Sequence, residues 1–297
     1  MALVSCSSDA PEFETVAVFD DVLPGDVVAL RSAGADVEYL SRRTGEVYRH
    51  GLGSGRATLL ATIPVGTDGE QRGLLGHTVI DGRRFAAWTE PESLVLLVGE
   101  VVDGHVDRIV WNGTATDSKA VGGHLEALDG QLLLGIGSLT DWARRHGSGA
   151  LLILDPDGEA DQEPFVYSDG WNNPWAFTVS SDGTVWVADN APDGSDLPVA
   201  EREGERISDA LRAGPELVDP PPQRAHSAIV ELPDGRLGVC GFLDDEMLAY
   251  ERLDDGGLER AGTIGACQTS ATVLDDGTIV VISVDDGAPT LRVRRPS

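Results

Sequence analysis

The feature that most constrains this chain is a turn that recurs six times along it. Six short segments share one layout, in which an apolar strand, a turn built on glycine and a second apolar strand follow one another. The turn glycines are Gly34, Gly82, Gly130, Gly183, Gly235 and Gly277. They recur at intervals of about 42 to 53 residues, which is the length of one four-stranded β-propeller blade. We expect each Asp-Gly pair to form a two-residue hairpin turn, because glycine readily adopts the positive φ that such a turn needs.

The segments around these turns also favour an all-β fold. The flanking strands carry β-branched and aromatic residues, and no long segment has the 3.6-residue periodicity of an amphipathic helix. Six such units predict a six-bladed β-propeller, with a β-sandwich as the alternative. Residues 289–295 are the expected third strand of the last blade, and residues 13–19 would pair beside them as its outermost strand. We therefore expect residues 1–12 to form a tether and residues 13–297 to form a single propeller.

The charge balance narrows the class of partner. The 297 residues include 22 basic and 50 acidic side chains, which gives a formal net charge of −28. A field of this sign repels phosphate backbones and anionic lipid surfaces, which argues against nucleic acid as a partner. No apolar run reaches the length of a membrane span. The expected partner is a small molecule, although the acidity also fits an adaptation for solubility or high salt.

The N-terminus carries a motif that bears on location. The residues LVSC at 3–6, followed by a Ser/Asp/Pro stretch, resemble the end of a bacterial lipoprotein signal, in which the cysteine is lipidated. This interpretation expects an apolar segment upstream, and it predicts an extracytoplasmic protein that contacts the membrane only through a lipid anchor at Cys6. The alternative is a chance tetrapeptide. Cys240 and Cys267 then form an even pair, either a disulfide of an exported protein or two buried thiols.

The loops that lead into the innermost strands define the candidate site. In a propeller these strands line a central channel, and their leading loops surround one mouth of it. Counting back about nine to eleven residues from each turn glycine selects one ring of positions. The ring contains Pro24, Asp26, Gln71, Arg72, Ala120, Asn172, Asn173, Arg224, His226, Cys267 and Gln268, and His77 and His124 lie further along their strands. With Trp171 and Trp175, these polar side chains predict a mouth that binds a sugar or another polar small molecule, although such residues also hold trapped water.

Several segments, in the same order along the chain, resemble the soluble glucose/sorbosone dehydrogenases. They are GEQRGLLG at 69–76, GGHLEALDGQLLLGIGS at 122–138, GWNNPWAF at 170–177, DGTVWVADNAPDGSD at 182–196, DGRLGVCGFLDDEMLAYER and ATVLDDGTIVVISVDDG. The resemblance extends over most of the chain. It implies a six-bladed propeller that carries pyrroloquinoline quinone (PQQ) and calcium and oxidises sugars outside the cytoplasm.

The functional residues of that family are matched only in part. The matching positions are Gln71, Asn173 and Pro174. The family's catalytic histidine aligns with Ala120, and its cofactor-binding arginine before Asn-Pro aligns with Asn172. Its paired arginines before the last blade align with Cys267 and Thr269. A trianionic quinone needs cationic partners, and these replacements therefore argue against PQQ-dependent oxidation.

Other residues of the mouth would have to supply the missing chemistry. The candidates for a replacement base are His124 and His226, and the candidates for a cationic partner are Arg72 and Arg224. The residues expected to bind a ligand are Gln71, Arg72, Asn172, Asn173, Trp171, Trp175, Arg224 and Gln268.

The segment that resembles the family's calcium loop carries oxygen ligands at close spacing, from Asn190, Asp193 and Asp196. The family's Asp-Glu pair reads Asp196-Leu197 here, so that one carboxylate is missing. The alternative to a calcium site is a solvated acidic loop.

Two classes of function follow from these residues. The first is an exported sugar-dehydrogenase-like propeller that binds a polar, sugar-like molecule at the channel mouth. The second is a noncatalytic binding or scaffold propeller at the cell surface, or a different reaction on the same scaffold, because a propeller does not by itself determine function.

Overall fold

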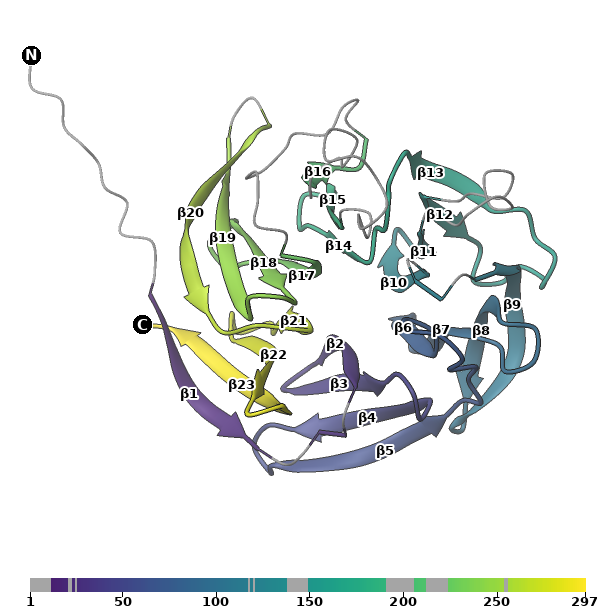
Figure 1. The fold of residues 1–297 in the computed structure, drawn as a ribbon, viewed down its shortest axis with the longest axis horizontal. Helices are drawn as coiled ribbons and strands as arrows, with labels where there is room; N and C mark the ends of the chain where they lie inside the picture. The colour runs from purple at the N-terminus through teal and green to yellow at the C-terminus, as the bar shows by residue number, and fades with distance from the viewer. Residues whose placement is uncertain are drawn as a thin grey trace, which may run out of the picture.

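The chain folds into a ring of antiparallel sheets. The computed structural model describes residues 12–20, 23–24, 26–116, 118–119, 121–137, 149–190, 206–211, 224–253 and 256–297. Within these ranges 23 strands form six sheets arranged around one axis (Figure 1). The protein is therefore all-β and a six-bladed β-propeller, as the spacing of the turn glycines predicts. None of the described residues belong to a helix that is long and apolar enough to cross a membrane.

Each blade is a meander that runs outward from the axis. Blade one contains β2 (Val27–Ala33), β3 (Asp36–Ser41), β4 (Glu46–Gly51) and β5 (Arg56–Thr62), and blade two contains β6 (Leu74–Ile80), β7 (Arg83–Thr89), β8 (Val95–Val102) and β9 (His105–Ala115). Blade three contains β10 (Gly122–Leu128), β11 (Gln131–Ile136), β12 (Ala150–Leu154) and β13 (Phe165–Asp169), and blade four contains β14 (Ala176–Val179), β15 (Val185–Asp189) and β16 (Arg206–Asp209). Blade five contains β17 (His226–Glu231), β18 (Leu237–Gly241), β19 (Glu246–Arg252) and β20 (Leu258–Gly265).

Blade six joins the two ends of the chain. It contains β21 (Ser270–Val273), β22 (Ile279–Asp285), β23 (Ala288–Pro296) and, outermost, β1 (Phe13–Phe19). β1 pairs antiparallel with β23, from Phe13 opposite Pro296 to Phe19 opposite Leu291 (Figure 1). The pairing predicted for residues 13–19 is thus observed, and it closes the ring so that β23 has no free edge.

The six turn glycines all adopt positive φ, between 68° and 85°. In blades two and three the preceding aspartates also have positive φ, as the predicted two-residue turn requires. The prediction is wrong for blades four to six. There the turns are longer: the Gly183 amide donates to the Ser180 carbonyl, and the Thr184 amide donates to the Asp182 carboxylate. The aspartate therefore stabilises the turn through its side chain, an arrangement that the Asp-Gly pair alone does not distinguish.

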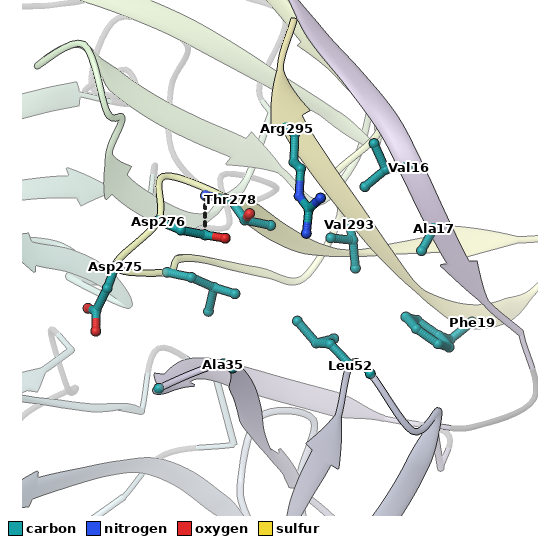
Figure 2. Close-up of a pocket in the computed structure, with 13 residues that line it drawn as sticks. Val16, Ala17, Phe19, Ala35, Leu52, Asp275, Asp276, Thr278, Val293 and Arg295 are labelled. Carbon is teal, nitrogen blue, oxygen red and sulfur yellow. Dashed lines mark hydrogen bonds between the residues drawn. The ribbon is translucent and has the colours of Figure 1, made fainter.

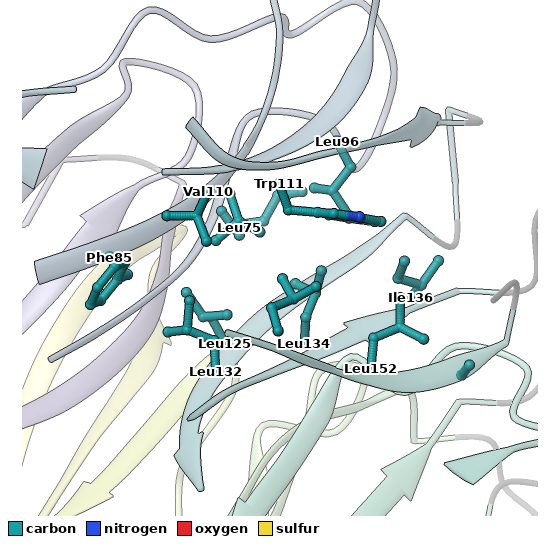
Figure 3. Close-up of a cluster of buried hydrophobic side chains, with 14 of the residues drawn as sticks. Leu75, Phe85, Leu96, Val110, Trp111, Leu125, Leu132, Leu134, Ile136 and Leu152 are labelled. Carbon is teal, nitrogen blue, oxygen red and sulfur yellow. The ribbon is translucent and has the colours of Figure 1, made fainter. Parts of the chain in front are cut away.

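Hydrophobic clusters between neighbouring sheets hold the blades together. Between blades two and three, Leu75, Trp111, Leu125, Leu134 and Leu152 are buried against one another (Figure 3). The middle strands are buried on both faces, which explains why they read as continuous apolar runs in the sequence. Burying each side chain of this size contributes about 1.5 to 3 kcal/mol, and these clusters therefore fix the geometry of the loops at the channel mouth.

Candidate functional site

The loops that precede the innermost strands surround a cavity of about 420 Å³, which we call the mouth pocket. Five blades contribute to it, through the loops before β6, β14, β17 and β21 and the start of β2. Its lining consists of Asp26, Val27, Val28, Arg42, Glu70, Gln71, Asn173, Trp175, Asn190, Ala225, His226, Ser227, Phe242, Gln268, Thr269, Val284, Gly287 and Pro289. The ring position of blade three, Ala120, lies outside the described residues.

The structure divides the predicted site residues into two groups. Those that line the mouth pocket are Gln71, Asn173, Trp175, His226 and Gln268, together with Asn190 from the predicted calcium loop. Those that do not line it are Arg72, Asn172, Trp171, Arg224 and His124. The other predicted calcium ligands, Asp193 and Asp196, and the predicted anchor, Cys6, lie outside the described residues.

A buried carboxylate organises the loop around the two asparagines. Asp189, at the end of β15, accepts hydrogen bonds from the backbone amides of Asn172 at 2.9 Å and Asn173 at 2.7 Å. It also accepts one from Arg206 Nε at 2.9 Å, and the Arg206 guanidinium lies over the Trp171 ring. Burial raises the pKa of Asp189, while the amides and Arg206 act in the opposite direction. Asp189 thus fixes the backbone that presents Asn173 to the pocket.

The side chains of the two asparagines differ in their partners. Asn172 Nδ2 donates to the Asn190 carbonyl at 2.6 Å, and this bond makes Asn172 part of the loop structure and not of the pocket lining. Asn173 is 5% exposed, and its Oδ1 has no hydrogen-bond partner among the described residues. Of the two asparagines predicted to bind a ligand, Asn173 thus lines the pocket with an unpartnered oxygen, and Asn172 does not line it.

Asn173 belongs to a set of buried polar atoms around the mouth pocket that lack a partner within the described part of the chain. They are Asp26 Oδ2, Gln71 Oε1, Asn173 Oδ1, Asn190 Oδ1 and Thr269 Oγ1. Buried polar atoms in native proteins almost always have a partner, which is either protein or ordered water. Five such oxygens beside one cavity are suited to a bound molecule that carries several hydroxyl groups, because a hydroxyl can donate to each of them.

The arginines near the mouth are occupied by other partners. Arg42 donates to the Asp26 carboxylate at 2.9 Å and to the carbonyls of Glu70 and Arg72. Arg72 donates to Thr116 Oγ1 at 2.9 Å, and Arg224 pairs with Asp244 and donates to the Glu246 carbonyl. Among the described residues Arg72 and Arg224 therefore hold loops in place, and neither lines the pocket as the predicted cationic partner would.

His226 is the predicted base that does lie at the mouth. It begins β17 and is 2% exposed. Burial, reinforced by the nearby Arg224, lowers the pKa of His226 to about 4, although a hydrogen bond with the Asp189 backbone acts in the opposite direction. The imidazole is therefore neutral at neutral pH. It can accept a proton or a hydrogen bond there, although a base of such low pKa has little driving force for proton abstraction.

His124 lies in a different cavity. It projects from β10 into a space of about 360 Å³ along the central channel, where its ring meets the edge of Phe177 and its Nε2 lies 3.2 Å from Glu126 Oε1. This channel cavity shares Trp175 and Ser227 with the mouth pocket. The two predicted bases are therefore in adjoining cavities and cannot substitute for each other in one site.

A disulfide supports the part of the mouth formed by blades five and six. Cys240 at the end of β18 is bonded to Cys267 in the loop before β21, which settles the choice between a disulfide and two thiols. The next residue, Gln268, donates from its Nε2 to the Phe242 carbonyl at 3.0 Å. The bond thus fixes the loop that carries Gln268 and Thr269 against blade five.

Thr269, Arg42 and Phe242 are among the lining residues that the spacing of the turns does not predict. The sequence points to Thr269 only as the replacement of a family arginine, and Arg42 comes from the β3–β4 turn, outside the ring of positions. Phe242 lies in the β18–β19 turn and is 49% exposed. A signal for it is present in the sequence, because Phe242-Leu243 is an apolar pair inside an otherwise acidic turn.

The lining of the mouth pocket does not suit PQQ. Among the residues that the structure describes, its charged lining is Arg42, Asp26 and Glu70, and with neutral His226 the formal charge is one positive against two negative groups, or −1. A quinone with three carboxylates needs cationic partners, and the one arginine of this described lining is already bonded to Asp26. For calcium, the described residues contain no group of three or more His, Cys, Asp or Glu side chains arranged to hold a metal ion.

A third cavity lies away from the mouth loops. It has a volume of about 600 Å³ and lies between blade six and blade one, where the apolar side chains of Val16, Phe19, Leu52 and Val293 line it together with Arg295 (Figure 2). None of the predicted site residues contributes to its lining, and we regard it as a packing groove beside the closing strand.

Comparison with known proteins places this architecture in a structural class. No family model matches the sequence, and no curated protein sequence matches it. Among solved structures the chain has the fold of the six-bladed propellers of PQQ-dependent glucose and aldose sugar dehydrogenases, at low sequence identity. The resemblance that the sequence motifs suggest is therefore confirmed at the level of the fold.

Three solved structures, two sugar dehydrogenases and one lyase, illustrate the similarity. A putative oxidoreductase (glucose dehydrogenase) from Thermus thermophilus is 20% identical, with a TM-score of 0.74 over 96% of this chain and 100% of the other. The PQQ-bound aldose sugar dehydrogenase from Streptomyces coelicolor is 15% identical, with a TM-score of 0.77 over 96% and 99%. A streptogramin B lyase is 10% identical, with a TM-score of 0.55 over 95% and 97%.

Proposed function

We propose that this sugar-dehydrogenase-like propeller binds a neutral, polyhydroxylated small molecule in its mouth pocket and does so without PQQ. The observation that carries the proposal is the set of five buried oxygens beside this pocket that lack a hydrogen-bond partner among the described residues. A sugar-like molecule supplies hydroxyl donors to these oxygens, and it places its apolar face on Trp175 and Phe242.

The size of the cavity and its charge support the same class of ligand. A volume of about 420 Å³ falls within the range of about 300 to 1,000 Å³ that is typical of small-molecule sites. The single arginine of the described lining is neutralised by Asp26, so that an anionic ligand would meet no free cation in this pocket. A neutral ligand needs no cationic partner, so this pocket favours a neutral molecule over an anion.

The test is binding of monosaccharides, disaccharides and alditols, measured by titration calorimetry. We expect saturable binding, and we expect Asn173→Ala and Gln71→Ala each to weaken it about 10- to 100-fold, because each variant removes a hydrogen bond in a buried site worth about 1 to 3 kcal/mol. Asn112→Ala removes an exposed amide on the outer strand of blade two and is the matched control. Equal affinity in the Asn173 and Asn112 variants would rule out the mouth pocket as the binding site.

We further propose that the protein works outside the cytoplasm. The Cys240–Cys267 disulfide supports this location, because such bonds persist in oxidising compartments. A lipid anchor at Cys6 remains part of this proposal, and mass spectrometry of the protein purified from its native membrane fraction would detect the acyl chains.

A further inference from the structure

A buried glutamate between blades one and two is surrounded by more positive charge than it can neutralise. Glu38 lies in the middle of β3 and has no exposed surface. Four cationic or titratable side chains converge on it from four strands: Arg31 of β2, Arg49 of β4, His77 of β6 and Arg84 of β7. The two blades that supply them are neighbours in the ring (Figure 1).

Two of the arginines saturate the carboxylate. Arg84 binds it with both terminal nitrogens, at 2.6 Å to Oε2 and 2.8 Å to Oε1. Arg49 adds two bonds to Oε1, at 2.7 Å from Nη2 and 3.2 Å from Nε. Arg31 approaches Oε2 only to 3.5 Å and makes no hydrogen bond among the described residues. The Arg31 guanidinium therefore retains its donors for another acceptor.

The cluster carries an excess of two positive charges. Burial lowers the pKa of His77, so the imidazole is neutral at neutral pH. Burial alone would raise the pKa of Glu38, but the hydrogen bonds from Arg84 and Arg49, together with the nearby His77, hold it far below its usual range, so the carboxylate is charged. Three guanidinium groups thus face one carboxylate. Such an imbalance is unexpected in a protein of net charge −28.

These arginines face a cavity of about 560 Å³ at the end of the propeller that carries the β2–β3 and β6–β7 turns, opposite the mouth pocket. Its charged lining consists of Arg31, Arg49, Arg83, Arg84, Glu38, Glu100 and Asp103. Glu100 is taken by Arg83 and Arg108, at 2.8 and 3.0 Å. Two further carboxylates offset part of the excess: Asp103 lies on the rim of this cavity, and Glu126, which shares the channel cavity with Arg31, acts on the Arg31 charge. The side chains of Arg31 and Arg49 are 32% and 46% exposed, so a molecule in the cavity can reach both.

We propose that this cavity is a binding site for a small dianion, of the phosphate or dicarboxylate type, held by Arg31, Arg49 and Arg84. The planar guanidinium group binds such oxyanions through paired N–H donors, and those of Arg31 and one edge of Arg49 are not used by Glu38. A contrast is provided between blades four and five, where Arg252 lies between two carboxylates, at 3.0 Å from both Asp182 and Glu231. At that interface two carboxylates face one arginine, so that negative charge is in excess and we expect no anion to bind there.

The experiment is a titration of the whole protein at pH 7.5 with inorganic phosphate and, separately, with succinate, each against potassium chloride of equal ionic strength. Calorimetry and the thermal midpoint are the two readouts. We expect at least one of the two anions to bind saturably and to raise the midpoint above that in chloride. Phosphate and succinate differ in geometry, and the tighter of the two identifies the class of ligand.

Arginine variants then locate the binding. Arg49→Gln should weaken it at least tenfold, and the double variant Arg31→Gln/Arg49→Gln should abolish it, whereas Arg252→Gln and Asn173→Ala should leave it unchanged. The half-buried position of Arg31 and the exposed position of Arg49 allow these variants to fold, which their own midpoints in chloride will verify. A midpoint that depends on ionic strength alone, or anion binding that persists in the double variant, would overturn the proposal. Neither result bears on the mouth pocket, whose test uses neutral ligands.

Discussion

Asp189 and its hydrogen-bond partners determine which of the two neighbouring asparagines, Asn172 and Asn173, faces the mouth pocket. Its carboxylate binds two backbone amides and Arg206, and this arrangement turns the Asn173 side chain to the pocket while Asn172 is bonded to the Asn190 carbonyl. Residues of the same type and of adjacent position thus have different roles. The difference is set by the carboxylate of Asp189 at the end of β15.

The buried histidines predict how stability depends on pH. Burial lowers the pKa of His50, His77 and His226, that of His226 to about 4. As the pH falls below about 6.5, the unfolded chain takes up protons that the folded protein does not, so the free energy of unfolding decreases. His226 alone accounts for up to about 3 kcal/mol of this decrease in the free energy of unfolding by pH 4. Below about 4.5 the unfolded chain also protonates Glu38, whose pKa in the folded protein is depressed, and this adds to the decrease.

Urea denaturation at a series of pH values between 7.5 and 4.5 measures this effect. His226→Gln should flatten the curve in that window, and the variant of the exposed His105, His105→Gln, should follow the wild type. Parallel curves for His226→Gln and the wild type would show that His226 protonates freely in the folded state.

The sequence could identify polar residues near the mouth but not their partners. Gln71, Asn173 and His226 were selected by counting from turn glycines, and all three line the pocket. Arg72 and Arg224 were selected by the same count, but Thr116 and Asp244 engage them from 44 and 20 residues away. Side-chain pairing across such distances depends on the tertiary arrangement, which the spacing of turns does not contain.

At the scale of the strand and loop, the Cys240–Cys267 bond joins the end of β18 to the loop before β21 and spans 27 residues. Closing a loop of that length in the unfolded chain corresponds to about 3 to 4 kcal/mol of stability. We expect the variant Cys240→Ala/Cys267→Ala to lose about this amount in urea denaturation and also to bind mouth ligands more weakly, because Gln268 follows Cys267.

A reducing agent provides the control for this variant. Reductant should lower the urea midpoint of the wild type and leave that of the double variant unchanged. If the wild type and the double variant unfold at the same urea concentration without reductant, the bond contributes nothing to stability.

The turns show what can be derived for a single element from the sequence. Asp-Gly located five of the six turns between the first two strands of a blade, yet it did not distinguish the two-residue turns of blades two and three from the longer turns of blades four to six. The distinction depends on what the aspartate does. Asp81 adopts positive φ itself, whereas the Asp182 carboxylate accepts a hydrogen bond from the Thr184 amide. Both choices are open to the same dipeptide.

At the scale of the molecule, the stability of the ring depends on the strand that closes it. β1 pairs with β23 and covers its edge. Deleting residues 1–20 removes this pairing and the packing of Phe13 and Phe19, and we expect a loss of about 3 to 6 kcal/mol and a tendency to aggregate through the freed edge. Deleting residues 1–11 retains β1 and is the control.

Thermal unfolding with light scattering compares the two deletions. An equal midpoint for both would mean that the closing strand does not stabilise the ring. The order of the six turns along the sequence was sufficient to predict this closure, because a meander of six units around an axis brings its two ends together. The charge cluster around Glu38 was not predicted, since its arginines come from two blades and meet only when the ring is assembled.

The central proposal is that the mouth pocket binds a neutral polar molecule and does not bind PQQ. It is tested most directly by titrating the protein with PQQ, with and without calcium, while following the quinone absorbance and the thermal midpoint. The charge of the lining predicts no saturable binding up to high micromolar quinone and no shift of the midpoint. Tight binding that survives moderate salt would contradict the claim and would restore sugar oxidation as the function to be assayed.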